Sequence, residues 1–336
     1  MKKLGRVLLT LVTIGVALVL VVLGIRLVNG LRYPDPPELA GNPQDAASYP
    51  TSVADASVER IEGDYLNGFH FTPNTRRHDG LVVVWGGSDG SPDFRRGARL
   101  AGEGYEVLSL FFFGQPNQRP VLADVPLEFF DEVLTWRAAH APTGPLTVIG
   151  TSKGAELALT LQAHYPEIDN VIVHTPTTHT WQGLDFTVEK PSWTWQGQPV
   201  PYVSFRHSDP ASVGQMFGAM LLNLPARLNE QYATALANDP GRDAAAIPFK
   251  LSGHLIAFAG EDDAMWPAAD AARHWGDAAP GRTEAHVYRD AGHLFGPFDG
   301  WAGGFDMGGT RAGNEAAQAA SDEVMDAALA AWHPAR

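Results

Sequence analysis

The chain has 336 residues, of which 45% are apolar, and this is enough to bury a substantial core in one large domain or two small ones. Its formal net charge of −14 would repel phosphate backbones, so nucleic acid is excluded as an expected partner. The chain contains no cysteine, which excludes thiol nucleophiles, disulfides and cysteine-based metal sites.

The first segment, residues 1–32, is predicted to be a membrane anchor. An uncharged apolar run from Val7 to Ile25 follows Lys2, Lys3 and Arg6. As a helix this run would measure about 28 Å, close to the thickness of the hydrocarbon core of a bilayer. A cleaved signal peptide is the alternative, but no small-residue cleavage site follows the run. The excess of basic residues before the run favours a single-pass protein with a cytoplasmic N-terminus and an extracytoplasmic domain.

Residues 33–55 are rich in Pro, Asp, Ala and Ser and lack periodicity. They are predicted to form an extended linker that holds the domain off the membrane. The remaining residues, 56–336, are predicted to form one catalytic domain. It begins with two antiparallel strands, VERIEG and LNGFHFTP, and a buried strand in the apolar run from Gly80 to Gly86.

Strands and helices alternate after this point, which predicts a mostly parallel, doubly wound sheet with helices on both faces. The expected strands are Tyr105 to Phe113, Leu146 to Ile149, Asn170 to His174, His254 to Gly260 and Glu284 to Tyr288. The expected helices are Phe94 to Gly102, Leu127 to His140, Ala155 to His164, Ala268 to Trp275 and Asn314 to Trp332.

The alternation is interrupted by an insertion at about residues 175–249. Two helical patches are expected in it, Val213 to Asn223 and Ala226 to Asn238. A long excursion between two strands of such a sheet is a common place for a lid over the active site, and a surface-packed insertion is an equal alternative.

A G-x-S-x-G pattern from Gly150 to Gly154 lies between a predicted strand and a predicted helix. A tight turn there would push the Ser152 hydroxyl into a cleft, where it could act as a nucleophile. The backbone amide of Lys153 would lie at the helix N-terminus and could stabilise a developing oxyanion.

A serine nucleophile needs a base, and the base needs an acid that fixes its tautomer. Asp263 and His293 follow Ser152 in the order typical of doubly wound hydrolases, each on a loop directly after a predicted strand. Asp262 is the rival acid, and Asp263 is preferred because it precedes Pro267 by the usual spacing. The other histidines considered, His254 and His286, lie within predicted strands.

The second oxyanion donor is expected after the first parallel strand, where Gly87 is the first candidate and Ser88 the second. A metal mechanism is not expected, because the sequence has no HExxH motif, no closely spaced histidine pair and no acidic calcium loop. No cofactor is expected.

Several blocks of the chain resemble the C-terminal catalytic domain shared by acyl-CoA thioesterases and the bile acid-CoA:amino acid N-acyltransferase, a branch of the α/β-hydrolase fold. The blocks are VPLEFFDEVLTW, GTSKGAELAL, WQGLDF, PSWTWQGQPVPYV, GEDDAMW, AGHLFGP and GGTRAGNEAAQ, and together the resemblance covers Ser57 to Trp332. GTSKGAEL is much more specific than G-x-S-x-G alone.

The resemblance implies a catalytic triad that falls on Ser152, Asp263 and His293. The amino-acid-conjugating members have a cysteine nucleophile, so the serine here makes the chain more similar to the thioesterases. The animal members also carry an N-terminal β-sandwich domain, whereas here only about 25 residues of possible strand precede the strand that begins at Gly80. The expected function is therefore hydrolysis of an acyl thioester or ester, a small-molecule substrate, as in acyl and fatty acid metabolism. Acyl transfer to an amine or alcohol is the alternative, and an inactive binding module is the third possibility.

Overall fold

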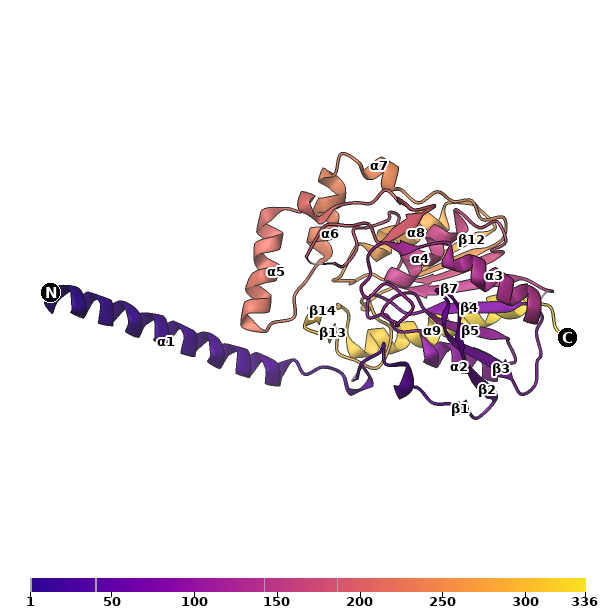
Figure 1. The fold of residues 1–336 in the computed structure, drawn as a ribbon, viewed down its shortest axis with the longest axis horizontal. Coiled ribbons are helices and arrows are strands. Elements are labelled where there is room, and N and C mark those ends of the chain that lie inside the picture. The colour runs from indigo at the N-terminus through magenta and orange to yellow at the C-terminus, as the bar shows by residue number, and fades with distance from the viewer. Residues whose placement is uncertain (1, 40, 142, 186) are drawn as a thin grey trace.

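The apolar runs pair side by side to form a central sheet. The computed structural model describes residues 2–39, 41–141, 143–185 and 187–336, and within these a nine-stranded sheet has the order β1-β2-β3-β5-β4-β7-β8-β11-β12 (Figure 1). In that order the strands are Ser52–Val53, Ala56–Glu62, Asn67–Pro73, Val107–Phe111, Leu81–Trp85, Leu146–Thr151, Asn170–His174, Leu255–Gly260 and Thr283–Tyr288. The strands from β5 to β12 pair in parallel, and β1, β2 and β3 are antiparallel. The predicted, mostly parallel α/β-hydrolase sheet is confirmed.

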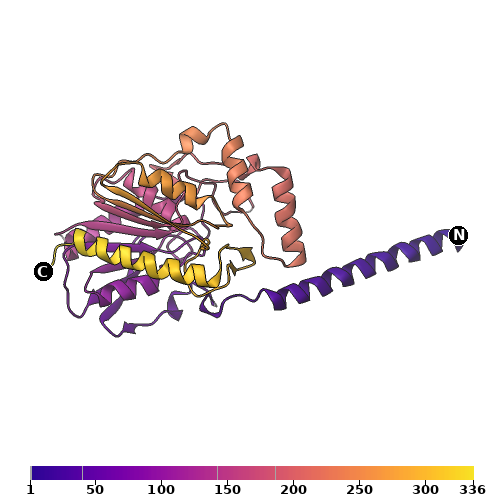
Figure 2. The ribbon, with the colours of Figure 1, turned by 180° about the vertical axis from the view of Figure 1, so that it is seen from behind.

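Helices cover both faces of this sheet because the buried strands are apolar on both sides. In β4, Val82 and Val84 pack with α2 (Phe94–Gly102) and α9 (Arg311–Trp332). The alternate residues of β4 pack on the opposite side, where α3 (Phe129–His140), α4 (Lys153–Gln162) and α8 (Ala268–Gly276) lie. Figure 2 shows α9 running across its face of the sheet.

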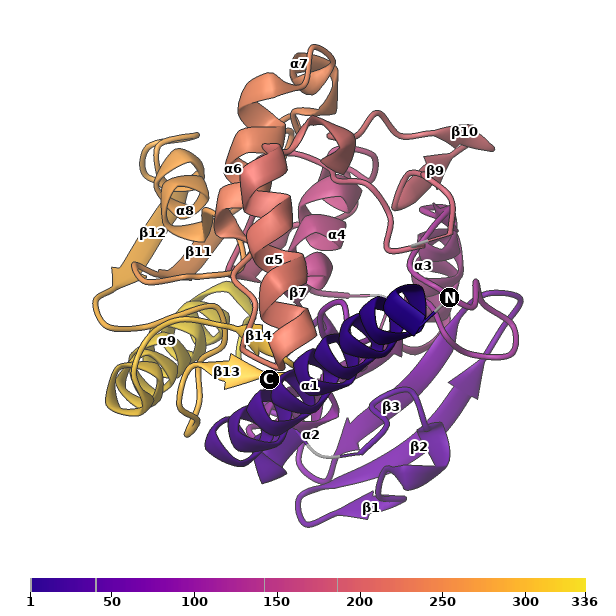
Figure 3. The same ribbon diagram turned by 90° about the vertical axis from the view of Figure 1, so that its left-hand side faces the viewer.

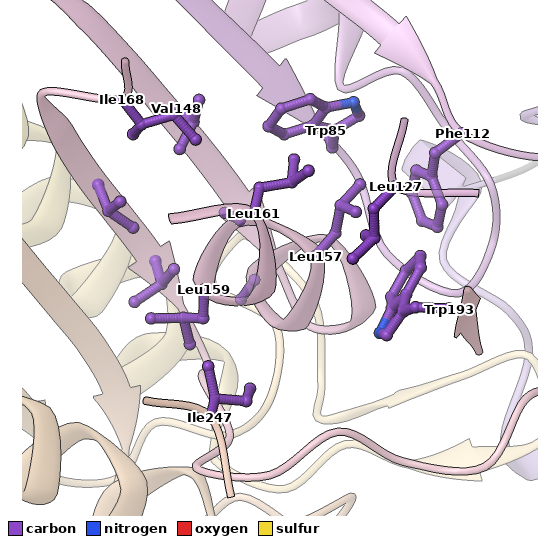
Figure 4. Close-up of a cluster of buried hydrophobic side chains, with 14 of the residues drawn as sticks. Trp85, Phe112, Leu127, Val148, Leu157, Leu159, Leu161, Ile168, Trp193 and Ile247 are labelled. Carbon is purple, nitrogen blue, oxygen red and sulfur yellow. The ribbon is translucent and has the colours of Figure 1, made fainter. Parts of the chain in front are cut away.

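Helix α4 lies at the centre of the larger core, and all of its residues are buried. Figure 4 shows Leu157, Leu159 and Leu161 leaving the helix on different sides, so that strands and the insertion enclose it. The helix begins at Lys153, two residues earlier than predicted, because Ser152 alone makes the turn from β7. The nucleophile candidate is therefore mounted on the most deeply buried helix of the domain.

The insertion between β8 and β11 has an inner part and an outer part. Its inner part includes the buried Trp181 and Trp193 and joins the core. A small sheet forms there from β6 (Val125–Pro126), β9 (Trp193–Trp195) and β10 (Gln198–Pro199), in the order β10-β9-β6, and a 3-10 turn follows at Phe205–His207. The outer part comprises α5 (Pro210–Leu222), α6 (Asn229–Asn238) and α7 (Arg242–Ala245). Figure 3 shows α5 standing on the side of the domain from which α1 projects.

The two predicted helical patches have different starts in the structure. Helix α5 begins at Pro210 because the Asp209 side chain accepts hydrogen bonds from the amides of Ala211 and Ser212. Helix α6 begins after Ala226, since this residue is held in a bridge to Phe305.

The N-terminal segment forms one continuous helix, α1 (Lys2–Arg32), that projects from the domain (Figure 1). Its stretch from Arg6 to Arg32 is long and apolar enough to cross a membrane, a property that a signal sequence near an N-terminus would share.

The described residues of the segment predicted as an extended linker, 33–39 and 41–55, contact the domain at several points, so the prediction of an extended linker is wrong. It contains short 3-10 turns at Pro37–Leu39 and Ala46–Ser48, and its end pairs with the sheet as β1. The Tyr49 ring stacks on Phe94 with 5.1 Å between ring centroids. Nearer α1, Trp301 Nε1 donates to the Pro34 carbonyl at 3.0 Å. Trp301 belongs to a hairpin of β13 (Trp301–Ala302) and β14 (Phe305–Asp306).

Four positions in the predicted segments lie outside the described residues. They are Met1 of the predicted anchor, Ala40 of the predicted linker, Pro142 of the predicted catalytic domain and Phe186 of the insertion, which also belongs to the WQGLDF block.

Candidate active site

Ser152 occupies a strained turn between β7 and α4. Its φ of 56° and ψ of −117° lie in a region that residues with a side chain rarely adopt. The flanking glycines make the turn possible, because a Cβ at Gly150 would lie 2.0 Å from the Gly154 carbonyl oxygen, and one at Gly154 would lie 2.0 Å from that of Gly86. The Ser152 amide donates to the His174 carbonyl at 3.0 Å, which ties the turn to β8. The backbone strain is therefore held in place by the sheet.

The structure brings Ser152, His293 and Asp263 together in one hydrogen-bonded chain. His293 Nε2 lies 2.8 Å from Ser152 Oγ, and His293 Nδ1 lies 2.8 Å from Asp263 Oδ2. A carboxylate accepts, so Nδ1 carries the proton and Nε2 is left to accept from the serine hydroxyl. All three residues are buried. This arrangement can remove a proton from Ser152 and hold it on the imidazole.

The two acidic candidates of the β11 loop have different environments. Asp263 is buried, and its second oxygen, Oδ1, accepts from the amides of Met265 at 2.8 Å and Trp266 at 3.2 Å. Asp262 is exposed. The preferred acid is thus the one that contacts the imidazole. The two strand histidines lie elsewhere: His254 stacks on Trp332, and His286 contacts Glu284.

The loop that carries His293 is held by Asn314 of α9. Asn314 is fully buried, its Oδ1 accepts from the Gly292 amide at 2.8 Å, and its Nδ2 donates to the Phe298 carbonyl at 3.3 Å. The His293 amide donates to the Met307 carbonyl at 2.6 Å. Sequence reasoning did not identify Asn314 as part of the site, although it lies in the GGTRAGNEAAQ block that carries the family resemblance.

The oxyanion candidates differ in how their amides are engaged. Among the described residues, no acceptor is recorded for the amide of Lys153, the first residue of α4. Gly87 lies beside the nucleophile candidate, since a Cβ there would be 3.3 Å from Ser152 Cβ. The Gly87 amide donates to Asp89 Oδ1 at 3.2 Å, so it would have to leave this carboxylate to bind an oxyanion. Ser88 is exposed.

The side chain of Lys153 forms a buried network that sequence reasoning missed. Its Nζ lies 2.6 Å from Glu156 Oε2 and 2.7 Å from Ser192 Oγ. Glu156 Oε1 accepts from the Trp181 amide at 3.0 Å and from Trp193 Nε1 at 2.7 Å. Burial lowers the pKa of Lys153 and raises that of Glu156, while each charge opposes the shift of the other. These hydrogen bonds attach the inner part of the insertion to the first turn of α4, directly after Ser152.

An aromatic ring from the loop after β11 lies against the imidazole, and the insertion packs behind that ring. The Trp266 ring lies 5.7 Å from the His293 ring in an edge-on arrangement, and Tyr232 of α6 lies 5.5 Å from Trp266. The Tyr232 ring also packs against the Trp181 ring, with 4.6 Å between the ring centroids. The insertion therefore contributes to the main core and supports the ring that lies against His293.

Comparison with known proteins assigns these residues to a described family. Residues 125–298 match the family model described as BAAT / acyl-CoA thioester hydrolase C terminal. Mouse acyl-coenzyme A thioesterase 6 is 36% identical over 104 residues, which are 30% of this chain and 25% of that protein. Mouse acyl-coenzyme A amino acid N-acyltransferase 1 is 30% identical over 126 residues, which are 36% of this chain and 30% of that protein. The matched part is thus only about a quarter to a third of these relatives.

Solved structures with a similar chain path include two esterases. An esterase/lipase from an uncultured bacterium aligns with a TM-score of 0.47 and 11% identity over 91% of this chain and 97% of that chain. An esterase from Pyrococcus furiosus aligns with a TM-score of 0.45 and 15% identity over 89% of this chain and 98% of that chain.

Proposed function

Because this chain belongs to the BAAT / acyl-CoA thioester hydrolase C-terminal family, we propose that it is a serine hydrolase that cleaves an acyl thioester or ester through Ser152, His293 and Asp263. The observation that carries the proposal is the hydrogen-bonded chain from Ser152 Oγ through the imidazole to Asp263 Oδ2. The strained backbone at Ser152 supports it, since such strain concentrates at functional sites.

The proposed reaction proceeds through an acyl-enzyme. Ser152 Oγ attacks the acyl carbonyl while His293 Nε2 takes the hydroxyl proton, and the amides of Lys153 and Gly87 stabilise the oxyanion. If the Gly87 amide does not bind the oxyanion, the amide of Ser88 is the second candidate for this role. The imidazolium then protonates the leaving thiol or alcohol, and the acyl group remains on Ser152 as an ester. Water attacks this ester with His293 again as the base, which releases the acid and restores the serine. Asp263 keeps the proton on Nδ1 throughout.

A fluorophosphonate probe tests the nucleophile. The wild-type chain should be labelled covalently, and Ser152→Ala should not be labelled, because the probe reacts only with an activated serine. The matched control is Ser57→Ala, an exposed serine of β2, which should be labelled like the wild type. Labelling that survives Ser152→Ala would overturn the assignment. A folded wild-type chain that is never labelled would favour an inactive binding module instead.

Acyl transfer is the second candidate, and the relatives named as amino acid N-acyltransferases favour it. In that case an amine would replace water in the second step, and the acyl-enzyme and the three residues would be the same. Product analysis with glycine competing against water distinguishes the two reactions: free acid alone supports hydrolysis, and an N-acyl glycine supports transfer.

The proposal includes membrane anchoring through α1, with the N-terminus in the cytoplasm and the domain on the outer face. The length and composition of the stretch from Arg6 to Arg32 support anchoring, and the basic residues before it support the orientation. Orientation bears on the leaving group, because acyl-CoA is available only on the cytosolic side. Since the chain has no cysteine, an exposed Ala278→Cys variant can be tested in intact cells with a membrane-impermeant maleimide. Labelling supports an outer-face domain, and labelling only after lysis supports a cytosolic one.

A further inference from the structure

Helix α5 has an outer surface that is unusual for a soluble domain. Phe217 is 61% exposed, Leu221 is 60% exposed and Met220 is 41% exposed. A Cβ at Gly214 or Gly218 would meet no atom within 4 Å, so the chain leaves this side of the helix uncovered. The residues at 214, 217, 218 and 221 follow helical spacing and therefore form one face.

No charged residue interrupts this surface. The sequence from Pro210 to Pro225 contains none of Asp, Glu, Lys or Arg, in a chain whose formal net charge is −14. An exposed helix in water normally carries charged and polar residues on its outer face. The lack of them indicates that this face of α5 is adapted to an apolar surrounding.

The contacts between α5 and the end of the α1 span indicate which apolar surrounding this face meets. Arg26 Nη1 donates to the carbonyls of Met220 at 2.9 Å and Leu221 at 2.8 Å, and Asn29 Nδ2 donates to the Leu222 carbonyl at 2.8 Å. These bonds engage carbonyls of the last turn of α5, where a helix lacks following amides to bind its carbonyls. The Met220 carbonyl also accepts from the Asn223 amide. The bonds from α1 also fix the last turn of α5 at the level of Arg26, directly after the apolar run that ends at Ile25. Figures 1 and 3 show α5 at a steep angle to α1, with one end of α5 beside α1.

We propose that α5 is a second membrane contact, which lies in the interfacial layer of the bilayer with Phe217, Met220 and Leu221 among the lipid chains. This inference rests on the proposed anchoring of α1. A short uncharged helix that crosses the end of a span is positioned for the boundary between head groups and acyl chains. Arg26 is a suitable residue at that depth, because it can reach toward head groups while its stem stays in the apolar layer.

The contact brings the rim of the candidate site to the membrane. The chain leaving α5 reaches the acid loop within a few residues, where the amides of Leu228 and Asn229 donate to the Ala264 carbonyl, next to Asp263. The Ala226 amide donates to the Gly304 carbonyl of the β13–β14 hairpin. That hairpin also binds Pro34 and Asp35, just after α1. The loops around the triad and the end of the span thus form one connected structure, and the substrate class this favours is an acyl ester or thioester that resides in the bilayer.

Site-specific quenching by lipids tests the proposal in the full chain. The lack of cysteine allows single variants Phe217→Cys and Leu221→Cys to carry one environment-sensitive fluorophore each. Leu18→Cys, in the middle of the span, and Ala278→Cys, which is exposed before the amino end of β12 and hence at the sheet end opposite the triad, are the controls. The variants are reconstituted into phosphatidylcholine and phosphatidylglycerol vesicles with a nitroxide quencher placed either near the head group or deep in the acyl chain.

The expected result is several-fold stronger quenching at 217 and 221 than at 278, with the shallow quencher more effective than the deep one. Leu18→Cys should show the reverse order of depth. If the Leu18 label is quenched and the α5 labels behave like the label at 278, α5 does not contact the membrane. The proposed anchoring by α1 would still be supported. If the Leu18 label is not quenched, the anchor fails, and this inference fails with it.

Protection of the α5 labels from aqueous iodide without quenching by lipid would mean that another copy of the chain covers this face, which also overturns the proposal. Thermal unfolding of each variant, compared with wild type, checks that the substitution leaves the fold intact. Two α5 positions are used so that one poorly tolerated label does not decide the result.

Discussion

At the scale of single residues, Asp263 is the most constrained group of the candidate site. One carboxylate oxygen faces His293 Nδ1 and the other accepts from two backbone amides. The side chain therefore has one orientation, and its charge stabilises an imidazolium only in that orientation. Asp262, its neighbour, is exposed and provides a matched comparison.

We expect Asp263→Asn to lower kcat for a p-nitrophenyl ester by about 10³- to 10⁴-fold, because the amide would favour the wrong imidazole tautomer. Asp262→Asn should turn over the ester at close to the wild-type rate. A large loss in Asp262→Asn, with Asp263→Asn active, would contradict the assignment of the acid.

The buried pair of Lys153 and Glu156 should be a strong determinant of stability. Lys153→Met leaves the Glu156 carboxylate buried without its partner, which should cost about 3–5 kcal/mol in the free energy of unfolding. The double variant Lys153→Met, Glu156→Gln removes both charges and keeps an oxygen for Trp181 and Trp193, so it should be more stable than the single variant. Urea denaturation measures both, and equal stability of the single and double variants would contradict a coupled pair.

Part of this site could be predicted from the sequence and part could not, for a physical reason. The order of Ser152, Asp263 and His293 can be read because each follows a parallel strand, and the carboxyl ends of such strands meet at one edge of the sheet. Glu156 and Asn314 lie inside helices, where a polar residue normally faces water. Only the packing of the insertion on α4 and of the His293 loop on α9 turns these two residues inward.

At the scale of elements, His333 joins the chain after α9 to β7 and to the segment before β4. His333 Nδ1 lies 2.7 Å from the Asp79 carbonyl oxygen, so Nδ1 donates, and Nε2 accepts from Thr147 Oγ1 at 2.8 Å. Both ring nitrogens are engaged in the neutral form. Burial lowers the pKa of His333 to about 4 from 6.5.

This site makes stability depend on pH. The unfolded chain takes up the His333 proton below pH 6.5 and the folded chain only near pH 4, so the neutral ring contributes stability above pH 6.5 that is lost as the pH falls toward 4. Protonation of His333 lowers the free energy of unfolding by about 3 kcal/mol at most. His174, whose pKa is also lowered by burial, acts in the same direction. Urea midpoints of wild type and His333→Gln across this range should converge on acidification, and parallel curves would contradict the role of His333.

Long elements were predictable and very short ones were not. Helix α2 and strand β8 have the predicted bounds, because apolar periodicity and flanking turn residues mark them. The pairs β6–β9 and β13–β14 contain strands of two or three residues, too short for any period to appear. The β6–β9 pair also joins segments that are distant in sequence, and local patterns cannot reveal such a contact.

At the scale of the whole molecule, the main difference from expectation is the segment of residues 33–55. Its composition is that of a flexible linker, yet it lies on the domain because single residues within it find specific partners. The Tyr49 hydroxyl donates to the Pro43 carbonyl, its ring packs on Phe69 and Phe94, and Gln44 is bonded to Asp89 and Gln115. Composition describes the average of a segment and cannot reveal a few such anchoring residues.

Hydrogen–deuterium exchange should detect this packing. Amides of residues 42–53 should exchange slowly in the wild type, and Tyr49→Ala should speed their exchange because the ring and the bond to Pro43 are both lost. Exchange in β8 should be unaffected and serves as the internal reference. Fast exchange of residues 42–53 in the wild type would mean that the segment is free in solution.

The bonds of Pro34 and Asp35 to the β13–β14 hairpin have a kinetic consequence. With α1 in a bilayer, they leave almost no tether between the span and the loops around Ser152, so the site is held at a constant height and samples a thin layer parallel to the membrane. Such an enzyme responds to the mole fraction of substrate in the surface rather than to its bulk concentration. Diluting a lipid substrate with inert lipid should slow turnover even when the total amount of substrate in the tube is unchanged.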